Sequence, residues 1–494
     1  MFKFVFSLAS LTRNPISLAL VLMLSADAVA DDYQPLRERI EWLMEQGGMP
    51  SLSISVAREG EIVFEEAWGY ADVEKQIPAS PDTPYSMASI SKPITAVALM
   101  RLVDKGRVDL DRPINDYLGE AKVTAHVGDP DEVTVRRVLN HTAGLPLHYH
   151  FFYEGSGANR PSMDESIHKY GHTVTAPGER FVYSNFGFGL LEYVIERVSG
   201  MTYSAFLDKE VFGPLGMTHS TVNRDKTFDL PAAVRYEKDG SVVSFYDFDH
   251  RGASAVYSST NDLVRFGSFL IGRSFPGQEE ILTPETRNQM TAVADFPDSH
   301  GESVYGLGIN VRNEEGWTIF SHSGGMPGVA TTLTTYPEQG IVVAVAVNTL
   351  KETTHSAVNE IRKTAFEIAR AGIPKTPPKL SDELVGEWQG AIHTDEGDIP
   401  LSVKIADDGG ISVSLAGGEY QAADLWDRDD EIHIIVARSI EIPVSDAKYS
   451  PHHLVLSVQR RGETLTGSAT AYSSPDIIPM GSALSFWVEL EKRS

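Results

Sequence analysis

The 494-residue chain contains no cysteine, and 68 Asp and Glu outnumber its 42 Lys and Arg. The absence of cysteine excludes a thiol nucleophile, a disulfide framework and a thiolate metal site. The net charge of -26 argues against nucleic-acid binding, because a nucleic-acid binder needs a basic face for the phosphates. Hydrophobic residues (42%) and charged residues (22%) occur at ordinary globular frequencies, and the length suggests about two or three domains.

Long hydrophobic runs are also lacking. A membrane-spanning helix needs about 20 apolar residues, and no apolar run in the sequence reaches that length. Near the N-terminus, Lys3 and Arg13 precede a short apolar run over residues 16–24, and small residues ending at Ala30 follow it. This order predicts a secretory signal peptide over residues 1–30, cleaved near Ala30. An uncleaved N-terminal anchor is the alternative. Cleavage would leave a periplasmic or secreted protein with no membrane span.

Proline marks a domain boundary late in the chain. Residues 372–379 contain three prolines within five positions, which predicts a linker because proline fits neither a helix interior nor a central strand. Residues 31–371 mix helix and strand patterns. Residues 380–494 contain short strand patterns separated by glycine-rich turns and no long helix pattern, which predicts a small antiparallel barrel or sandwich.

The periodicity of apolar residues places individual elements. Helices are expected at residues 34–46, 95–105, 188–198, 261–271 and 352–371. Strands are expected at 51–58 and 61–68, joined by a hairpin, and at 317–321, 329–336 and 341–347. In the C-terminal part, strands are expected at 401–405, 411–415, 432–436, 454–458, 464–469 and 486–490.

The first motif with chemical content is Ser89-Ile90-Ser91-Lys92. Residues three apart share one face of a helix, so Ser89 and Lys92 can lie together. Pro93 is tolerated only in a first helical turn, which places the helix start near Ser89. An amine held neutral beside a serine can accept its proton. Alone, the motif also fits a solvated helix start.

Two further motifs follow along the chain. In Tyr183-Ser184-Asn185, a phenol can relay a proton and an amide can bind a substrate amide. In residues 322–325 (His-Ser-Gly-Gly), glycine permits close approach of the backbone and offers N–H donors to an oxyanion, while His322 can supply a hydrogen bond or a charge. Ordinary turns explain either motif equally well when it is taken alone.

Taken in this order, the three motifs resemble the signatures of the serine β-lactamase and penicillin-recognising enzyme superfamily. They are similar in particular to its class C β-lactamases, D-aminopeptidases, D,D-peptidases and esterases. Three flanking stretches resemble further signatures: residues 139–146 (Leu-Asn-His-Thr-Ala-Gly-Leu-Pro), 257–263 (Tyr-Ser-Ser-Thr-Asn-Asp-Leu) and 305–308 (Tyr-Gly-Leu-Gly). The resemblance covers roughly residues 33–370. It implies an α/β sandwich on an antiparallel sheet with a helical subdomain, and it implies no metal or other cofactor.

The resemblance also implies a role for each residue. Ser89 would be the acylated nucleophile, Lys92 the activating amine and Tyr183 the proton shuttle. Asn185 would bind a substrate amide. The backbone N–H groups of Ser89 and Gly325 would form the oxyanion hole. Water would then attack the ester on Ser89.

At His322 the chain departs from proficient β-lactamases, which carry Lys in the corresponding K-T-G motif; Gly324 occupies the glycine of that motif. Imidazole is only partly charged at neutral pH, so binding of an antibiotic carboxylate should be weaker. Histidine here resembles D-aminopeptidases, D-specific peptidases and some esterases. Residues 386–390 (Gly-Glu-Trp-Gln-Gly) look like the start of the lipocalin-like all-β barrel attached to some of these peptidases.

Histidine and aromatic clusters offer other candidate sites. His148 with His150, and His168 with His172, have metal-ligand spacings, but neither pair has an evident third ligand. We therefore assign them to loops near the site rather than to a metal. The aromatic residues 149–153 either line the cleft or pack the helical subdomain.

The sequence thus favours an exported serine hydrolase with an acyl-enzyme intermediate, of D-aminopeptidase-like or esterase type, acting on small-molecule or peptide substrates. A working β-lactamase is one alternative. The other is a non-catalytic binding protein of the penicillin-recognising fold. The sequence does not indicate the oligomeric state.

Overall fold

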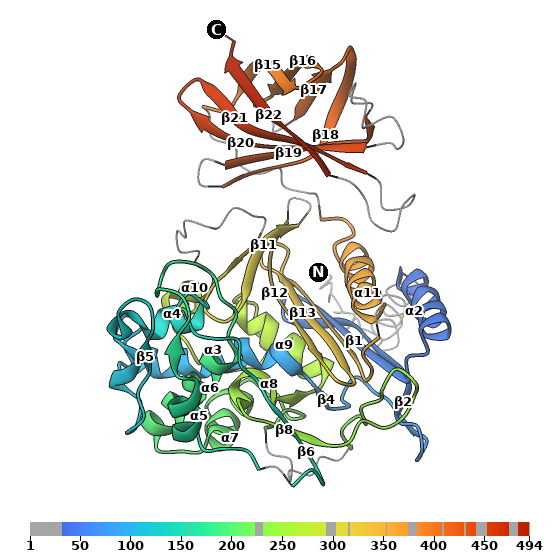
Figure 1. Cartoon of the computed structure of the whole chain (residues 1–494). Helices are drawn as coiled ribbons and strands as arrows, with labels where there is room; N and C mark the ends of the chain where they lie inside the picture. Colours follow the sequence, from blue (N-terminus) through green and yellow to red (C-terminus); the bar gives the residue numbers. More distant parts are fainter. Residues whose placement is uncertain are drawn as a thin grey trace, which may run out of the picture. The chain divides into compact units, whose positions relative to one another are not determined.

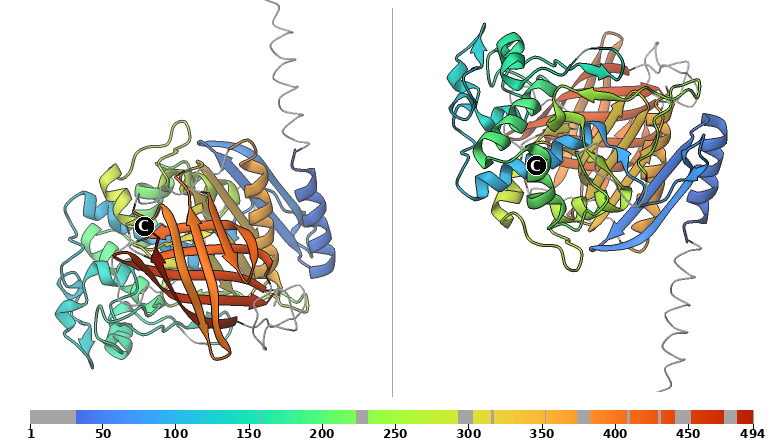
Figure 2. Two further views of the ribbon diagram at one scale, coloured as in Figure 1. Left: turned by 90° about the horizontal axis from the view of Figure 1, so that it is seen from above. Right: turned by 90° about the horizontal axis from the view of Figure 1, so that it is seen from below.

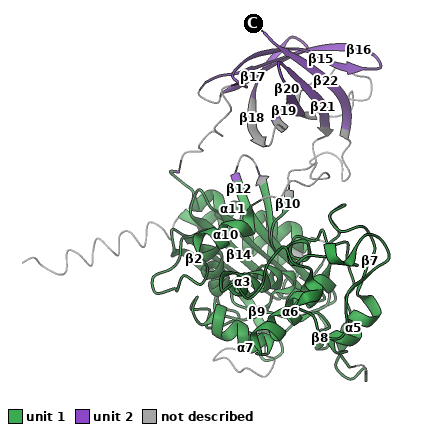
Figure 3. Ribbon diagram, turned by 90° about the vertical axis from the view of Figure 1, so that its left-hand side faces the viewer, with its two compact units in different colours: residues 1–312, 318–372 green, residues 313–317, 373–494 purple. Residues whose placement is uncertain are grey.

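The computed structural model describes residues 32–157, 159–222, 231–292, 303–314, 317–351, 353–373, 383–407, 410–428, 431–440, 452–473 and 483–493. The predicted signal peptide and residues 374–379 of the predicted linker lie outside these ranges. The chain divides into two compact units, one of residues 1–312 and 318–372 and the other of residues 313–317 and 373–494 (Figure 3). Among the described residues, no helix has the length and apolar content to cross a membrane.

An eight-stranded sheet organises the first unit (Figure 1). Its order is β10-β11-β12-β13-β14-β1-β2-β3, and every pairing recorded between neighbours is antiparallel. The strands are β1 (Ser51–Arg58), β2 (Glu61–Asp72), β3 (Ile77–Pro78), β10 (Ser303–Tyr305), β11 (Asn310–Glu314), β12 (Trp317–Met326), β13 (Val329–Tyr336) and β14 (Ile341–Val347).

Helices cover both faces of this sheet. Every residue of β13 and β14 is therefore buried, whichever face its side chain points to. On one face α11 packs against β13, β14 and α2. On the other face α9 packs against β1, β13 and β14. Figure 2 shows the remaining helical segments gathered on the side away from α2. The helices are α2 (Gln34–Gly47), α3 (Ser91–Asp104), α4 (Val135–Leu139), α5 (Met163–Tyr170), α6 (Asn185–Ser199), α7 (Tyr203–Leu207), α8 (Arg251–Ser254), α9 (Thr260–Leu270), α10 (Pro284–Thr291) and α11 (Thr354–Ala369).

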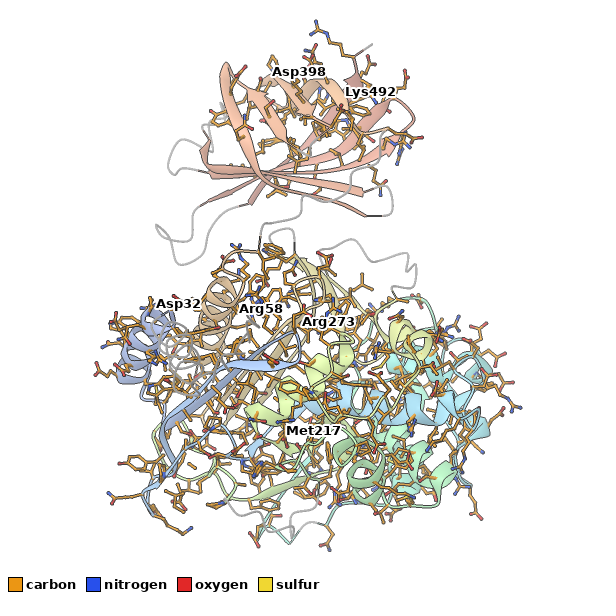
Figure 4. All side chains as sticks on the ribbon, turned by 180° about the vertical axis from the view of Figure 1, so that it is seen from behind. Asp32, Arg58, Met217, Arg273, Asp398 and Lys492 are labelled. Carbon is orange, nitrogen blue, oxygen red and sulfur yellow. The ribbon has the colours of Figure 1, made fainter. Side chains whose placement is uncertain are left out.

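Short elements connect these layers. Three two-stranded sheets pair β4 (Tyr85–Ser86) with β9 (Tyr257–Ser258), β5 (Thr124–Ala125) with β7 (His172–Thr173), and β6 (Phe151–Tyr153) with β8 (Tyr246–Phe248). Single helical turns are η1 (Ala88–Ile90), η2 (Ile114–Asp116), η3 (Pro130–Glu132) and η4 (Asp208–Phe212). The side chains in Figure 4 include Met217, which is buried in the core of this unit.

The second unit is a closed eight-stranded antiparallel barrel whose strands follow chain order. Trp388 lies in its core among aliphatic side chains and donates its indole N–H to the carbonyl of Leu384 at 2.9 Å. Gly390 makes closure possible, since a Cβ at this position would lie 1.9 Å from the carbonyl oxygen of Glu489 on the partner strand β22. The strands are β15 (Gly386–Thr394), β16 (Gly397–Ile405), β17 (Ile411–Leu415), β18 (Gly418–Arg428), β19 (Glu431–Ile440), β20 (His452–Arg461), β21 (Thr464–Ser473) and β22 (Ala483–Lys492).

The predicted α/β class with a large antiparallel sheet, followed by a separate all-β part, is confirmed. The expected helices and strands all occur, most of them with different ends. The expectation that residues 322–325 lie between strands is wrong: β12 continues through them, and its pairing with β13 extends to Met326. The likeness of the barrel to lipocalins stays a prediction.

Candidate active site

Ser89 lies in the single helical turn η1, immediately before α3. The preceding residue, Ala88, has φ of +47°, a conformation that costs a non-glycine residue about 1–3 kcal/mol. Two hydrogen bonds hold this turn: Thr331 donates to the carbonyl of Met87 at 3.1 Å, and Ser91 donates to that of Ala88 at 2.7 Å. The strained turn thereby fixes the partly exposed Ser89 against the central sheet.

Lys92 is fully buried one turn further, and its Nζ lies within hydrogen-bond distance of three oxygens. These are Ser89 Oγ at 3.2 Å, Asn185 Oδ1 at 2.7 Å and the carbonyl oxygen of Ala253 at 3.1 Å. No carboxylate is among them. Burial without a counter-charge holds the pKa of Lys92 well below its usual range.

The lowered pKa favours the neutral amine, the form in which Lys92 can work as a base. The oxygens of Ala253 and Asn185 can only accept hydrogen bonds, so they take the two N–H groups of a neutral Lys92. The remaining lone pair of the neutral amine would then face Ser89 Oγ, 3.2 Å away, and could accept the hydroxyl proton. Lys92 is therefore poised to remove the proton of Ser89.

Tyr183 has the opposite electrostatic character. Burial raises its pKa to about 12, although a hydrogen bond with Ser89 lowers it slightly. Its ring also lies against Lys92, whose Nζ is 4.7 Å from the ring centroid. Tyr183 is hence protonated at neutral pH, and it suits donation of a proton rather than its removal.

The start of α6 places Tyr183 and Asn185. Ser184 caps the helix by accepting the N–H of Gly187 at 2.9 Å, and it donates to the carbonyl of Pro146 at 2.6 Å. Asn185 donates its backbone N–H to the carbonyl of Leu147 at 2.9 Å. Hydrogen bonds to Pro146 and Leu147 thus hold Ser184 and Asn185 of the second motif in place.

His141 also holds this motif in place, and its own backbone is strained, with φ of +62°. Its ring Nδ1 accepts the N–H of Ser184 at 3.1 Å, and its ring packs against Tyr183 and Tyr305. Desolvation, together with the nearby Lys92, holds the pKa of His141 well below its usual range. The stretch 139–146, recognised in the sequence by resemblance alone, therefore positions the second motif.

His322 is buried in β12. Its Nε2 accepts a hydrogen bond from the hydroxyl of Tyr305 at 2.9 Å, and its Nδ1 donates to the carbonyl of Ser323 at 2.7 Å. Burial, together with the nearby Lys92, lowers the pKa of His322 to about 3, although the hydrogen bond to Ser323 acts in the opposite direction. Of the two roles that the sequence left open, the structure favours hydrogen bonding over a charge.

Glycine is required at position 324 for β12 to approach η1. A Cβ there would lie 2.3 Å from both the carbonyl oxygen of Met87 and Oγ1 of Thr331. Gly325 points the other way and, with Ser89, lines one cavity of about 890 Å³. The two residues assigned to an oxyanion hole thus border the same space.

The chain is similar to known proteins over most of its first unit. The model of the family described as Beta-lactamase matches residues 36–365. This chain belongs to the Beta-lactamase family. Protein flp of Staphylococcus aureus (strain MRSA252) is 27% identical over 334 residues, an alignment that covers 64% of each chain. The chain therefore spans less than two thirds of the length of this relative.

Solved structures show the same fold. The octameric penicillin-binding protein homologue from Pyrococcus abyssi has a TM-score of 0.58 at 24% identity, covering 87% of this chain and 97% of that one. SurE in complex with D-Leu has a TM-score of 0.56 at 22% identity, covering 87% and 98%. At these identities the likeness concerns the fold alone.

Members of the Beta-lactamase family are in general serine hydrolases, and the structure brings the residues of the three predicted motifs to one place. Ser89, Tyr183, Asn185 and Gly325 line the cavity, and Lys92 lies directly beneath Ser89. His322 and Gly324, both on β12, are buried and are not among the residues that line the cavity.

The rest of the cavity wall is largely apolar, with one charged stretch. The sequence left two roles open for the aromatic residues 149–153. Tyr149 and Phe151 line the cavity, and Phe151 also packs on Tyr246 of β8. Glu237, Lys238 and Asp239 form the charged stretch. No sequence pattern distinguishes this stretch, because short charged segments are common on any protein surface.

The structure adds positioning residues that the motifs do not contain. Ala253 contributes only its backbone carbonyl, which no sequence pattern reports. Tyr305 was visible as part of a family-like stretch, but its bond to His322 joins residues on different strands. Gly308 lets this stretch pack on α3, since a Cβ there would lie 2.4 Å from Cβ of Ala96.

Proposed function

We propose that this chain is a serine hydrolase that forms an acyl-enzyme on Ser89 and acts on D-amino-acid amides or small acyl esters. One observation carries the proposal above all. The Nζ of Lys92 meets three neutral oxygens, two of which can only accept, so its lone pair is directed at Ser89.

The steps follow from the hydrogen bonds. Lys92 takes the proton of Ser89 while Oγ attacks the substrate carbonyl. The N–H groups of Ser89 and Gly325 stabilise the resulting oxyanion. Tyr183 donates its proton to the leaving amine or alcohol and regains one from Lys92. Water then attacks the acyl ester along the reverse proton path, which restores Ser89.

Asn185 has a divided role in this scheme. Its Oδ1 accepts from Lys92 at 2.7 Å, which leaves its NH₂ group for a substrate carbonyl. Because Asn185 lines the cavity, one amide both orients the base and binds the substrate.

The walls of the cavity favour apolar or positively charged substrates over anionic antibiotics. His322, which replaces the lysine of proficient β-lactamases, is neutral and bonded to Tyr305, so it offers no fixed cation to a carboxylate. Glu237 and Asp239 line the cavity with Lys238 between them, so this stretch carries a net negative charge that suits the free ammonium of an amino-acid amide. SurE was solved with D-Leu, which places D-leucine derivatives among the substrates to try.

A turnover screen on one purified batch tests the proposal. We expect D-leucine p-nitroanilide or p-nitrophenyl butyrate to be hydrolysed with a higher kcat/KM than nitrocefin, and Ser89→Ala to abolish all three activities. A kcat/KM for nitrocefin above about 10⁴ M⁻¹s⁻¹, exceeding that for the other two substrates, would instead identify a β-lactamase. Absence of turnover and of covalent labelling by a fluorophosphonate would indicate a binding protein.

A further inference from the structure

A second cluster of ionisable side chains lies beside the cleft. His148, just before β6, meets Asp249 and His250, which directly follow β8. His148 Nδ1 is 2.9 Å from His250 Nε2, and each of these nitrogens is 3.4 Å from Asp249 Oδ2. Among the residues that the structure describes, this is the one group of three or more such side chains whose ligand atoms converge in this way.

The cluster is deeply buried yet incompletely hydrogen-bonded. The side chains of Asp249 and His250 are at most 1% exposed, and that of His148 is 17% exposed. Asp249 Oδ1 accepts the backbone N–H of His150 at 3.1 Å, but Oδ2 has no hydrogen-bond partner. A buried carboxylate oxygen without a partner is costly, and a cation bound to it removes that cost.

The spacing of the three atoms is close to one face of a metal tetrahedron, although the hydrogen bond between His148 and His250 would have to lengthen and give way to the ion. With ligand bonds of about 2.0–2.2 Å, neighbouring ligand atoms of tetrahedral zinc lie about 3.3 Å apart. The triangle of His148 Nδ1, His250 Nε2 and Asp249 Oδ2 has edges of 2.9, 3.4 and 3.4 Å. Two imidazoles and one carboxylate suit zinc or cobalt, whereas magnesium and calcium prefer oxygen ligands alone.

We propose that His148, Asp249 and His250 bind one divalent transition-metal ion, with a fourth position left for water or a substrate group. The sequence showed only the pair His148 and His150, and no third ligand. The fold supplies two ligands from about 100 residues further along the chain, in place of His150. The proposal does not depend on acyl-enzyme chemistry at Ser89.

The ion would join two walls of the cavity. Leu147 and Tyr149 flank His148, and Phe248 precedes Asp249; all three line the cavity. Leu147 also accepts the N–H of Asn185 through its carbonyl. Metal binding would thus tie the segment before β6 to the segment after β8 and stiffen the side of the cleft that meets Asn185.

Cobalt titration of the full chain, stripped with a chelator and carrying no histidine tag, tests the site. We expect about one equivalent of Co²⁺ to bind with visible absorption bands of four-coordinate cobalt, and one equivalent of Zn²⁺ to displace it. His148→Ala and Asp249→Asn should each weaken binding at least tenfold. His150→Ala is the matched control, because it removes a neighbouring imidazole but keeps the backbone N–H that bonds Asp249.

Each outcome decides for or against the site. Wild-type protein without the cobalt bands, or His148→Ala and Asp249→Asn variants that bind as tightly as wild type, would overturn it, as would an equal loss in His150→Ala. Circular dichroism checks the folding of each variant. If Asp249→Asn does not fold, the partly exposed His148→Ala together with the wild-type spectrum decides the question. A rise of the wild-type melting temperature with Zn²⁺, absent in His148→Ala, gives a readout separate from activity.

Discussion

Lys92 is a lysine in a place where a charged ammonium has no partner of opposite charge. The unfolded chain protonates it up to its ordinary pKa of about 10.5, whereas burial lowers the pKa in the folded state. Between these two values the unfolded state binds more protons, so Lys92 lowers stability, and this loss shrinks as the pH rises. The strain at the active site is therefore in part electrostatic.

A prediction follows for Lys92→Met, which keeps the volume and removes the amine. We expect acylation of Ser89 to fall about 10²–10⁴-fold, because the general base is lost. The stability advantage of the variant over wild type should be largest near neutral pH and decline towards pH 10. Urea unfolding of both proteins across this range measures it; a difference that does not vary with pH would contradict the buried neutral amine.

The pH dependence of turnover gives a second prediction at the same scale. kcat/KM should rise with pH as Lys92 loses its proton, and fall only near the pKa of Tyr183, which is about 12. His322, with a pKa of about 3, should contribute nothing between pH 5 and 8. The variant His322→Asn should be less active, because it loses the hydrogen bond with Tyr305. It should keep the shape of the pH profile of kcat/KM, because His322 does not titrate in this range. A limb between pH 5 and 8 that disappears in this variant would show that His322 titrates there.

At the scale of elements, the approach of β12 to η1 depends on Gly324. Gly324→Ala should place a methyl group against the carbonyl of Met87 and reduce kcat about 100-fold or more, because small displacements of catalytic groups have effects of this size. Gly106→Ala is the control: its φ is +65°, but a Cβ there has nothing within 4 Å. It should lower stability by about 1–2 kcal/mol and leave kcat unchanged.

Kinetics and thermal melting of both variants separate the two effects. Equal losses of kcat in Gly324→Ala and Gly106→Ala would mean that Gly324 acts through general stability and not through the position of β12.

Closure of the barrel gives a prediction for Gly390. Gly390→Val should force β15 away from β22, since even a Cβ would lie 1.9 Å from the carbonyl of Glu489. Hydrogen exchange followed by mass spectrometry should show faster exchange in β15 and β22 than in wild type, with β16 and β17 less affected. Unchanged protection of β15 and β22 would show that the strands do not need this close approach.

Particular elements show how far the sequence could be read. β17 occupies the expected residues because its apolar positions alternate cleanly, and β15 and β18 were not expected as strands. The sequence of β18, with Gln421 and Asp424 among alanines, lacks that alternation. Likewise β12 runs through Gly324 and Gly325, which usually end strands, because its pairing with β13 outweighs their weak propensity.

The candidate site was predictable where its residues are close in sequence or part of a family-like motif. Ser89 and Lys92 lie three residues apart on one turn, so local geometry sufficed. Asp249 joins His148 only through the pairing of β6 with β8, and the carbonyl of Ala253 has no sequence signature. Long-range contacts and backbone groups therefore account for most of what was missed.

For the whole molecule, each unit has its own hydrophobic core. We expect calorimetric unfolding that does not fit a single two-state transition, because independent cores unfold separately. A single transition with equal calorimetric and van't Hoff enthalpies would show that the two units unfold as one.

Export remains a proposal based on the first thirty residues. We expect the chain expressed in a Gram-negative host to be recovered from the periplasm with Asp31 at its N-terminus. N-terminal sequencing of the recovered protein checks this, and a chain that keeps residues 1–30 in the membrane fraction would favour the uncleaved anchor.

The central claim is that Ser89 is acylated, and intact-mass spectrometry after incubation with a fluorophosphonate probe tests it most directly. The account predicts one added probe mass on wild type, located on the peptide that contains Ser89, and none on Ser89→Ala. Equal labelling of wild type and Ser89→Ala would contradict it.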